Sequence, residues 1–182
     1  VLRGDIILGK NVNIGPYCII ENSTIGDDGI IEAFCHIENS VVGQCSVLGP
    51  YARLRVGTTI GKNCKVGNFV EIKNTSFESE SKANHLSYLG DAKIGNKVNI
   101  GAGTITCNYD GKTKHLTYIE DNVFVGSNTE LIAPLTLKTG STIAAGSSIT
   151  DDVPGNALGI ARSKQLSIKN WKHSKARPKK RK

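Results

Sequence analysis

The stretch from Lys82 to Lys114 contains the side chains best suited to chemistry in this sequence. It holds one histidine, two tyrosines, several asparagines and lysines, and the small-residue run Gly101–Gly103. Histidine is the usual proton acceptor near neutral pH, and lysine is a point charge that binds anions. Because a single residue of these types is more often a solvated surface group, its meaning depends on which others lie beside it.

Those neighbours can be predicted because the chain repeats with a period of six residues. From Leu8 onward an aliphatic residue recurs at this spacing, often followed by glycine, and the recurrences group into eight triplets. Three short strands per triplet, joined by tight corners, make one turn of a triangular parallel β-helix. We therefore predict an all-β parallel β-helix of about eight coils with the aliphatic residues inside. The inward residues are Leu8, Ile14, Ile20, Ile25, Ile31, Ile37, Val42, Leu48, Leu54, Ile60, Val66, Ile72, Phe77, Ala83, Leu89, Ile94, Ile100, Thr106, Ile119, Val125, Leu131, Leu137, Ile143 and Ile149.

The repeat has one long gap, between Thr106 and Ile119. Because the register resumes unchanged afterwards, we expect residues 107–118 to form a loop extruded from one corner. The β-helix is expected to occupy residues 1–152, followed by a C-terminal arm and basic tail at 153–182.

The net charge of +7 comes from the C-terminal end. Residues 161–182 contain ten Lys and Arg and no acid, whereas residues 1–160 contain thirteen Lys and Arg against sixteen Asp and Glu. The segment HSKARPKKRK contacts an anion or nucleic acid, or is a solvated tail, and composition leaves both open. A nucleic-acid-binding module is the weakest interpretation of the whole chain, because the body is acidic and aromatic residues are few.

Five cysteines are an odd number, and no C-x-x-C motif occurs. This disfavours a disulfide framework or a zinc cluster. Cys18, Cys35 and Cys64 fall at one position of the repeat, so we expect buried free thiols in a reducing cytoplasm. No apolar run approaches the roughly 18 residues of a membrane span and no signal peptide is visible, so no membrane contact is expected. The start at Val1, already inside the repeat, suggests a cut through a longer protein.

Residues at equal positions of successive coils should lie about 4.8 Å apart, the spacing between strands of a sheet. Arg55 and Lys73 follow the third strand of adjacent coils and are predicted to be stacked cations. A bound phosphate would relieve their repulsion. Alternatively, Arg55 pairs with Glu38 of the same column and Lys73 is solvated. Glu71 should lie beside Tyr88 of the next coil, which completes a polar patch suited to a phosphorylated polyol or amine.

A second column lies two places after the second strand of each triplet. It consists of Asn68, His85, Ala102, Ser127 and Ala145. A groove of roughly 14 Å floored by small residues could hold an extended arm such as pantetheine, with its thioester at the histidine. Alternatively, small residues merely suit the corners and His85 is a surface histidine. The column and the adjoining patch together favour His85 as a general base.

Four motifs in this region resemble one family. The motifs are RLR at Arg53–Arg55, GNFVEIK at Gly67–Lys73, KANHLSYLGDAKIG at Lys82–Gly95 and NIGAGTITCNYDGKTK at Asn99–Lys114. They are similar to the acetyltransferase half of bacterial bifunctional N-acetylglucosamine-1-phosphate uridyltransferase/glucosamine-1-phosphate N-acetyltransferases, a branch of the hexapeptide-repeat acyltransferases. The likeness runs over nearly the whole chain, including Trp171 and the basic tail. For the fold it implies a left-handed β-helix, whereas the general crossover rule would favour the right hand.

The resemblance implies an enzyme that transfers acetyl from acetyl-CoA to the 2-amino group of glucosamine 1-phosphate. The product, N-acetylglucosamine 1-phosphate, serves the synthesis of UDP-N-acetylglucosamine, a precursor of peptidoglycan and lipopolysaccharide in the bacterial cytoplasm. The family forms homotrimers with sites between subunits. Its uridyltransferase half, which uses Mg²⁺, is absent from this chain, and no metal site is expected here.

The resemblance also assigns roles to individual residues. His85 matches the proton acceptor of the family, and beside it Glu71 would orient the imidazole or hold the substrate ammonium. Positions matching the site for the sugar phosphate or nucleotide sugar are Arg55, Lys73, Tyr88, Asn99 and Lys114. Positions matching the acetyl-CoA site are Ala102, Asn108, Tyr109, Ser127, Ala145 and Arg162. The oxyanion donor stays open between the backbone N–H groups of Gly101–Gly103 and the Asn108 amide.

Other functions fit the sequence less well. A different acyltransferase of this fold would keep the His85 column but not the pair of Arg55 and Lys73. A γ-type carbonic anhydrase needs three zinc histidines, and His36, His85 and His115 stand at unrelated positions of the repeat. A non-catalytic scaffold would explain the repeat but not the polar columns.

Overall fold

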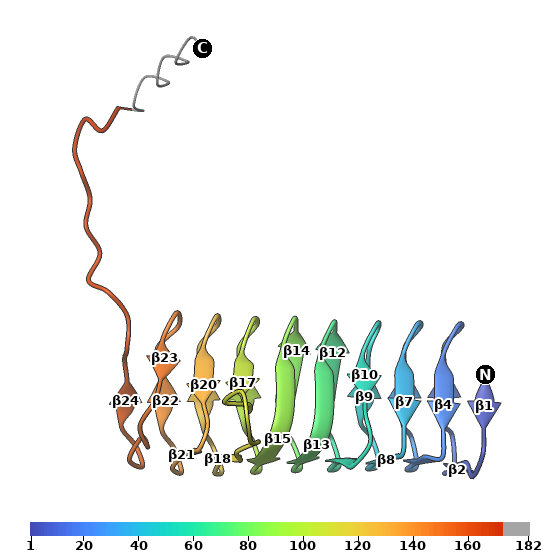
Figure 1. Ribbon diagram of the computed structural model, residues 1–182. Coiled ribbons are helices and arrows are strands. Elements are labelled where there is room, and N and C mark those ends of the chain that lie inside the picture. Colours follow the sequence, from blue (N-terminus) through green and yellow to red (C-terminus); the bar gives the residue numbers. More distant parts are fainter. Residues whose placement is uncertain (173–182) are drawn as a thin grey trace.

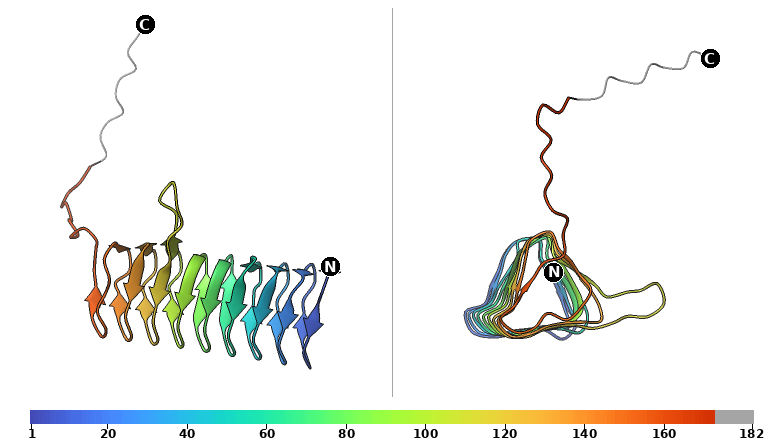
Figure 2. Two further views of the ribbon diagram at one scale, coloured as in Figure 1. Left: turned by 60° about the horizontal axis from the view of Figure 1, so that its bottom comes forward. Right: turned by 90° about the vertical axis from the view of Figure 1, so that its left-hand side faces the viewer.

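The computed structural model describes residues 1–172, and the basic segment at 173–182 lies outside the described residues. Residues 1–172 contain strands and turns but no helix, and hence no helix long and apolar enough to cross a membrane. The short strands stack along one axis, and the view down that axis is a triangle (Figures 1 and 2). The predicted all-β parallel β-helix is confirmed, and the solenoid fits the left-handed form.

The prism has three faces, each a ladder of parallel strands. Face A consists of β1 (Leu2–Arg3), β4 (Ile19–Glu21), β7 (His36–Glu38), β10 (Arg53–Leu54), β13 (Glu71–Phe77), β15 (Tyr88–Ile94), β17 (Ile105–Cys107), β20 (Glu130–Ile132) and β23 (Ser148–Ile149). Face B consists of β2 (Ile7–Leu8), β5 (Thr24–Ile25), β8 (Ser40–Val42), β11 (Thr58–Ile60), the second halves of β13 and β15, β18 (Thr117–Ile119) and β21 (Leu135–Leu137). Face C consists of β3 (Asn13–Ile14), β6 (Ile30–Ile31), β9 (Val47–Leu48), β12 (Lys65–Asn68), β14 (Lys82–His85), β16 (Asn99–Ile100), β19 (Phe124–Val125), β22 (Thr142–Ile143) and β24 (Leu158–Gly159).

Strands β13 and β15 turn the corner from face A to face B without interrupting their ladder. On face A, Glu71 of β13 pairs with Arg53, and on face B, Ser76 pairs with Thr59. The two long strands also pair with each other on both faces. Their backbone is therefore fixed by ladder hydrogen bonds on either side of the corner, which is where the polar cluster lies.

The predicted inward residues form the core. They are buried in all coils except the first, where Leu8 and Ile14 belong to the terminal strands of their ladders. The polar exception, Thr106, is also buried, and its hydroxyl accepts a hydrogen bond from Gly90 N at 2.7 Å and donates to Gly90 O at 3.0 Å. This buried polar group is therefore satisfied, as buried hydroxyls usually are.

The ladders extend beyond the predicted triplets at both ends. At the start, Leu2 pairs with Ile20. At the end, Val153 and Gly159 continue the columns of the last triplet through pairs with Leu137 and Ile143. The solenoid consequently has about nine turns instead of eight, and the chain stays hydrogen-bonded to it as far as Arg162 before the C-terminal arm leaves (Figure 2).

Cys18, Cys35 and Cys64 are buried free thiols, as predicted. Burial raises the pKa of Cys35 to about 11 and also raises the pKa of Cys64. Both are therefore neutral thiols near pH 7 and act as small core residues. Within residues 1–172, no group of three or more His, Cys, Asp or Glu side chains is placed to hold a metal ion.

The corner between faces A and B needs a left-handed backbone conformation. Asn22, Asn39, Asn74 and Asp91 occupy the same place in their coils, with φ of 43°, 44°, 46° and 48°. Asn and Asp adopt this conformation more readily than other residues with side chains. Asp91 thus puts a carboxylate at a corner position where three other coils have an amide.

The corner between faces C and A changes character along the axis. In the early coils it carries a ridge of exposed rings stacked 4.8–5.1 Å apart, formed by Tyr17, Phe34, Tyr51 and Phe69. Leu86 continues the ridge, and Gly103 of the next coil ends it. The ridge therefore ends in the coil that contains His85, and the next coil has a glycine at this position.

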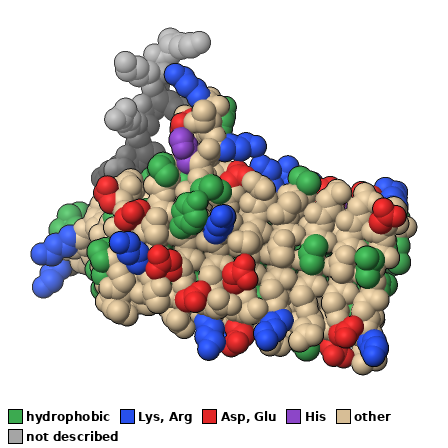
Figure 3. Space-filling view, turned by 90° about the horizontal axis from the view of Figure 1, so that it is seen from below, with side chains coloured by type: hydrophobic (Ala, Val, Ile, Leu, Met, Phe, Trp, Pro, Cys, Tyr) green, Lys and Arg blue, Asp and Glu red, His purple; other side chains and the backbone are tan. Residues whose placement is uncertain are grey.

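The predicted loop lies where the gap in the repeat placed it. It leaves the corner between faces A and B after β17 and returns at the start of β18 (Figure 2). In the space-filling view the loop projects from the prism, with Lys and Arg side chains near its base (Figure 3). It therefore stands at the same corner as Asp91.

Candidate active site

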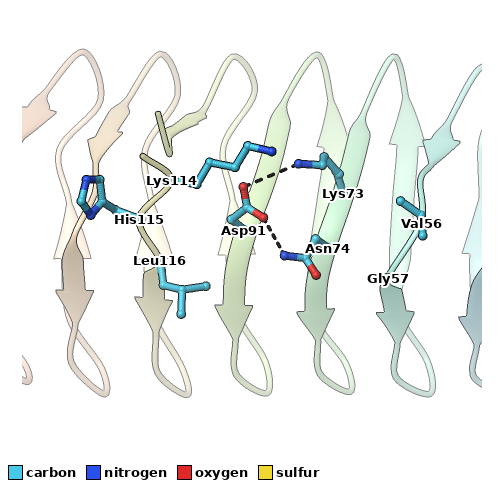
Figure 4. Close-up of a pocket in the computed structure, with 8 residues that line it drawn as sticks. All are labelled: Val56, Gly57, Lys73, Asn74, Asp91, Lys114, His115 and Leu116. Carbon is cyan, nitrogen blue, oxygen red and sulfur yellow. Dashed lines mark hydrogen bonds and ion pairs between the residues drawn. The ribbon is translucent and has the colours of Figure 1, made fainter. Parts of the chain in front are cut away.

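A cavity of about 530 Å³ lies where the loop meets the body (Figure 4). Lys73 and Lys114, both matched by resemblance to sugar-phosphate ligands, come together in it. Asp91, to which no role was assigned from the sequence, lies between them. The residues lining the cavity are Val56, Gly57, Lys73, Asn74, Asp91, Lys114, His115 and Leu116.

Asp91 is the buried centre of this cluster, with 5% of its surface exposed. Its Oδ1 accepts a 2.6 Å hydrogen bond from Asn74, its Oδ2 accepts a short one from Asn108, and Lys73 Nζ lies 3.7 Å from Oδ2. Burial alone would raise the pKa of Asp91, but the two amides and the charges of Lys73 and Lys114 outweigh it and hold the pKa below its usual value. Asp91 is therefore a carboxylate at neutral pH.

The loop that carries Lys114 is ordered by its own hydrogen bonds. Asp110 accepts hydrogen bonds from the backbone N–H groups of Lys112 and Thr113 and from the Thr113 hydroxyl. His115 Nε2 lies 2.7 Å from the Asp110 carboxylate, and this contact is the main reason why the pKa of Asp110 is lowered. We call these four residues the Asp110 clasp.

Lys114 extends from this clasp toward Lys73 (Figure 4). The neighbouring Lys73 ammonium lowers the pKa of Lys114, while Asp91 acts in the opposite direction. Two ammonium groups that converge on one cavity create a site for an anion, and a phosphate would satisfy both.

Arg55 and Lys73, predicted to be equivalent stacked cations, have different partners. Arg55 forms a 2.9 Å ion pair with Glu71, which raises the pKa of Arg55, while Glu38 contributes only a weaker electrostatic effect. The Lys73 side chain is 16% exposed and faces Asp91. The alternative in which Arg55 pairs with Glu38 and Lys73 is solvated is therefore wrong.

Tyr88 completes the patch on face A. It lies in register with Glu71, as the column predicted. Its phenol folds over Gly90, where an added Cβ would collide with the Tyr88 hydroxyl and ring. Because Gly90 is in turn the register partner of Lys73, the phenol lies beside the lysine column.

His85 ends β14 at the corner between faces C and A, in register with Asn68 of β12 as predicted. Its Nδ1 lies 2.7 Å from Asn68 Oδ1. An amide oxygen only accepts hydrogen bonds, so Nδ1 is the donor in this contact, and the tautomer that fits it has its lone pair at Nε2. Asn68 is thus placed to orient the ring, which was one of the two roles predicted for Glu71, whereas Glu71 is paired with Arg55.

A second cavity, of about 450 Å³, adjoins this histidine. It is lined by Gly49, Pro50, Lys65, Gly67, Asn68, Asn84 and His85. His85 itself is exposed, so solvent or a substrate can reach the ring.

The column of small residues continues from His85 as predicted. Successive coils are joined along it by hydrogen bonds from Asn128 N to Ala102 O and from Gly146 N to Ser127 O, both 2.8 Å. The Arg162 guanidinium donates to Ala145 O at 2.6 Å. The structure therefore brings together Ala145 and Arg162, two positions that resemblance assigned to acetyl-CoA.

Three other predicted residues lie in different surroundings. Asn108 is buried and donates to Asp91. Tyr109 is exposed on the loop, where its hydroxyl donates to Gly111 O at 2.7 Å. Asn99 lies on face C in register with Lys82, a different face from the one that carries Lys73.

Two of the possible oxyanion donors are already used. The N–H of Gly101 donates to Val125 O at 2.9 Å, and the N–H of Gly103 donates to Leu86 O at 3.1 Å. These bonds belong to the stacking of the coils, so the two glycine N–H groups are poor candidates. The Asn108 amide keeps a second N–H beyond the one that it gives to Asp91.

Several known proteins have sequences related to this chain. Residues 117–151 match the family described as hexapeptide repeat of succinyl-transferase. Bifunctional protein GlmU from Herminiimonas arsenicoxydans is 49% identical over 171 residues, which are 94% of this chain and 38% of that protein. GlmU from Baumannia cicadellinicola is 51% identical over 175 residues, which are 96% of this chain and 37% of that protein.

The chain is similar to the C-terminal part of GlmU. The family likeness expected from the four motifs is thereby confirmed. The chain spans less than two fifths of the length of these GlmU relatives.

Solved structures share the fold of this GlmU-like chain at lower identity. LpxA from Acinetobacter baumannii has a TM-score of 0.60 and 19% identity, with 88% of this chain and 69% of that chain covered. The UDP-N-acetylglucosamine acyltransferase from Campylobacter jejuni has a TM-score of 0.54 and 16% identity, with 88% and 71% covered. Likeness at this level shows the β-helix fold alone.

Asp91 and Asn68 are two residues of the candidate site whose side-chain partners were not predicted. The signal for Asp91 was the corner column, in which an acid follows Asn39 and Asn74 at a place that points toward the loop. The signal for Asn68 was its place one coil below His85, where an amide is within hydrogen-bond reach of a ring.

Proposed function

We propose that this chain is a glucosamine-1-phosphate N-acetyltransferase, which moves acetyl from acetyl-CoA to the 2-amino group of the sugar. The observation that carries the proposal is the convergence of Lys73 and Lys114 on one cavity beside the loop. A non-catalytic scaffold does not need two facing lysines, and neither does an acyltransferase whose acceptor is uncharged. The likeness to GlmU supports the same assignment.

The phosphate end of the substrate is assigned to Lys73, Lys114 and Arg55. The two lysines offer point charges, and Arg55 adds a planar fork at the edge of the patch. Tyr88 lies beside them. Asn99, on face C, is also assigned to the sugar phosphate or the nucleotide-sugar product.

The chemical step is assigned to His85. The substrate amine attacks the thioester carbonyl only when it is neutral, and Nε2 of the imidazole accepts the proton that the nitrogen loses. A C–N bond forms, the C–S bond breaks, and coenzyme A leaves as its thiol. General-base help of this kind contributes on the order of 10²–10⁴-fold.

We assign Glu71 the second of its two predicted roles, contact with the substrate ammonium. Its carboxylate is held by Arg55 on the face that leads from the lysine cavity toward His85. In this place it can hold the amine end of the sugar before the proton is removed.

Acetyl-CoA is assigned to the column of small residues. Ala102, Ser127 and Ala145 leave room along the corner, and Arg162 stands at its far end as a cation for the coenzyme phosphates. Asn108 and Tyr109 complete this set, with the free N–H of the Asn108 amide as the oxyanion donor.

The assembly is proposed to be a homotrimer with sites between subunits, in the bacterial cytoplasm. The loop and the arm beyond Arg162 both project from the prism, and we assign them the contacts with a second copy (Figure 2). Sedimentation at micromolar concentration should then give about three times the chain mass of 19.5 kDa. A fully active monomer would refute the trimer. UDP-N-acetylglucosamine is expected as a further ligand, whereas the Mg²⁺-dependent uridyltransferase reaction of bifunctional relatives is not assigned to this chain.

The activity is tested by measuring thiol release from acetyl-CoA with glucosamine 1-phosphate, beside unphosphorylated glucosamine. We expect rapid release with the phosphorylated amine and slow release with glucosamine. Equal rates on both amines would point to a different acyltransferase. If no thiol is released and the chain binds neither acetyl-CoA nor the sugar phosphate, a scaffold is the better interpretation.

A further inference from the structure

Asp91 has no part in the proposed chemistry, yet it bonds side chains on both sides of the lysine cavity. Asn74 and Lys73 belong to β13 of the preceding coil, and Asn108 is the first residue of the loop. Each carboxylate oxygen has its own partners, Oδ1 with Asn74 and Oδ2 with Asn108 and Lys73. One buried group therefore ties the base of the loop to the strand that carries Lys73.

We propose that Asp91 is a positioning residue that fixes Lys73 and the base of the loop relative to each other, and so sets where Lys73 and Lys114 meet the sugar phosphate. This inference rests on the proposed function of the site. The carboxylate acts through the two lysines and does not itself touch the phosphate, which carries the same charge.

The need for a carboxylate at this position follows from charge and from hydrogen bonding. Two facing ammonium groups repel each other in the empty cavity, and the anion beneath them offsets that repulsion. An Asn residue would keep the size and the left-handed corner, but its NH₂ group would face the NH₂ group of Asn74 or Asn108. Asp91→Asn therefore removes the charge and one of the two amide bonds with little change in shape.

The substitution should also change the response to pH. The charged groups that act on Asp91 are Lys73 from β13 and Lys114 from the loop. His115 lines the same cavity but contacts Asp110, and Tyr88 lies on the same strand as Asp91. Because Asp91 favours the charged form of Lys114, its removal lowers the pKa of that lysine further. The rise in KM at alkaline pH should then begin at a lower pH in the variant than in the wild type.

The test compares Asp91→Asn with Asp121→Asn, using KM for glucosamine 1-phosphate, kcat and the pH profile. Asp121 is a matched control because it is also a corner aspartate that accepts hydrogen bonds from an adjoining coil, through Asn96, away from the lysines. We expect Asp91→Asn to raise KM about 10-fold, on the scale of one charge-assisted hydrogen bond. We expect Asp121→Asn to leave KM and the pH profile unchanged.

A second pair of variants separates positioning from a general loss of structure. In a Lys73→Met background, the further change Asp91→Asn should raise KM by less than it does in the wild type, because one of the two lysines through which Asp91 acts is gone. The inference would be overturned if Asp91→Asn raised KM by the same factor in both backgrounds, or if the Asp91→Asn enzyme kept the wild-type KM and pH profile. A wild type without acetyl transfer would instead overturn the proposed function, so the two failures can be told apart.

Discussion

The lysine cavity and the corner that carries His85 differ in how many contacts hold their polar side chains in place. In the cavity, Lys73 faces a buried carboxylate that is itself held by two amides. At the other corner of face A, His85 is exposed and has Asn68 as its ring partner. The proposed phosphate-binding side of the site is thus held by buried contacts, whereas the proposed proton acceptor lies exposed at the surface.

This difference predicts that substitutions in the two regions will have different effects on turnover and on substrate recognition. A change at the exposed histidine should alter turnover without altering stability, because few contacts are lost. A change in the lysine cavity should alter recognition of the sugar phosphate, because the buried partners lose their arrangement. The expected effects run from the histidine, through the cations and Asn68, to the loop.

The largest effect is expected from His85→Ala. Removal of the general base should lower kcat by about 10²-fold or more, with the melting temperature almost unchanged. Steady-state kinetics and thermal unfolding check this, with His36→Ala on face A as the matched histidine control. Unchanged turnover in His85→Ala would remove the histidine from the mechanism.

The next effect is expected from Lys73→Ala and Arg55→Ala. Each should lower kcat/KM for glucosamine 1-phosphate by about 10–100-fold and leave the KM for acetyl-CoA nearly unchanged. Lys73→Ala should be the more severe, because its buried carboxylate partner Asp91 loses the nearer of its two counter-charges. Arg55→Lys should also reduce kcat/KM, because the planar fork is lost while the charge remains. Lys97→Ala, which removes an exposed lysine on a distant corner, is the control.

A smaller effect is expected from Asn68→Ala. Without the amide oxygen the His85 ring is free to turn and to carry its proton on either nitrogen, so kcat should fall about 10-fold. The KM for glucosamine 1-phosphate should stay close to the wild-type value. A KM effect as large as that of Lys73→Ala would mean that Asn68 binds the sugar and does not orient the ring.

The smallest effect is expected from Asp110→Asn in the Asp110 clasp. Exposed ion pairs contribute little, so KM for glucosamine 1-phosphate should rise only about 2–5-fold. Since His115 lowers the pKa of Asp110, the clasp is fully formed above the usual Asp pKa of about 4 and is lost only as the pH falls below that value. KM in the wild type should therefore show no change attributable to Asp110 between about pH 5 and 8. A KM change of 100-fold would give the loop a much larger role.

The fold was predictable because its signal is periodic. An aliphatic residue at every sixth position determines which side chains point inward, and the register follows from the spacing alone. The same spacing placed Glu71 beside Tyr88 and Asn68 beside His85. What the period could not give is the partner that a side chain chooses among neighbours at similar distance.

Arg55 and Lys73 show this limit. Both stand in one column, yet Arg55 turns to Glu71 of the next coil and Lys73 turns to Asp91 at the corner. The choice depends on burial and on the loop, which brings Lys114 to Lys73 from outside the repeat. The number of turns was underestimated for a related reason, since the terminal ladders at Leu2 and Gly159 lack complete triplets.

The most direct test of the account is the ratio of kcat/KM on glucosamine 1-phosphate to kcat/KM on glucosamine, measured for the wild type and for Lys73→Ala. If the lysine cavity recognises the phosphate, the wild-type ratio is high and the variant ratio falls by about 10–100-fold, with the rate on glucosamine almost unchanged. If Lys73→Ala lowers activity on both amines by the same factor, the cavity does not recognise the phosphate and the central claim is wrong.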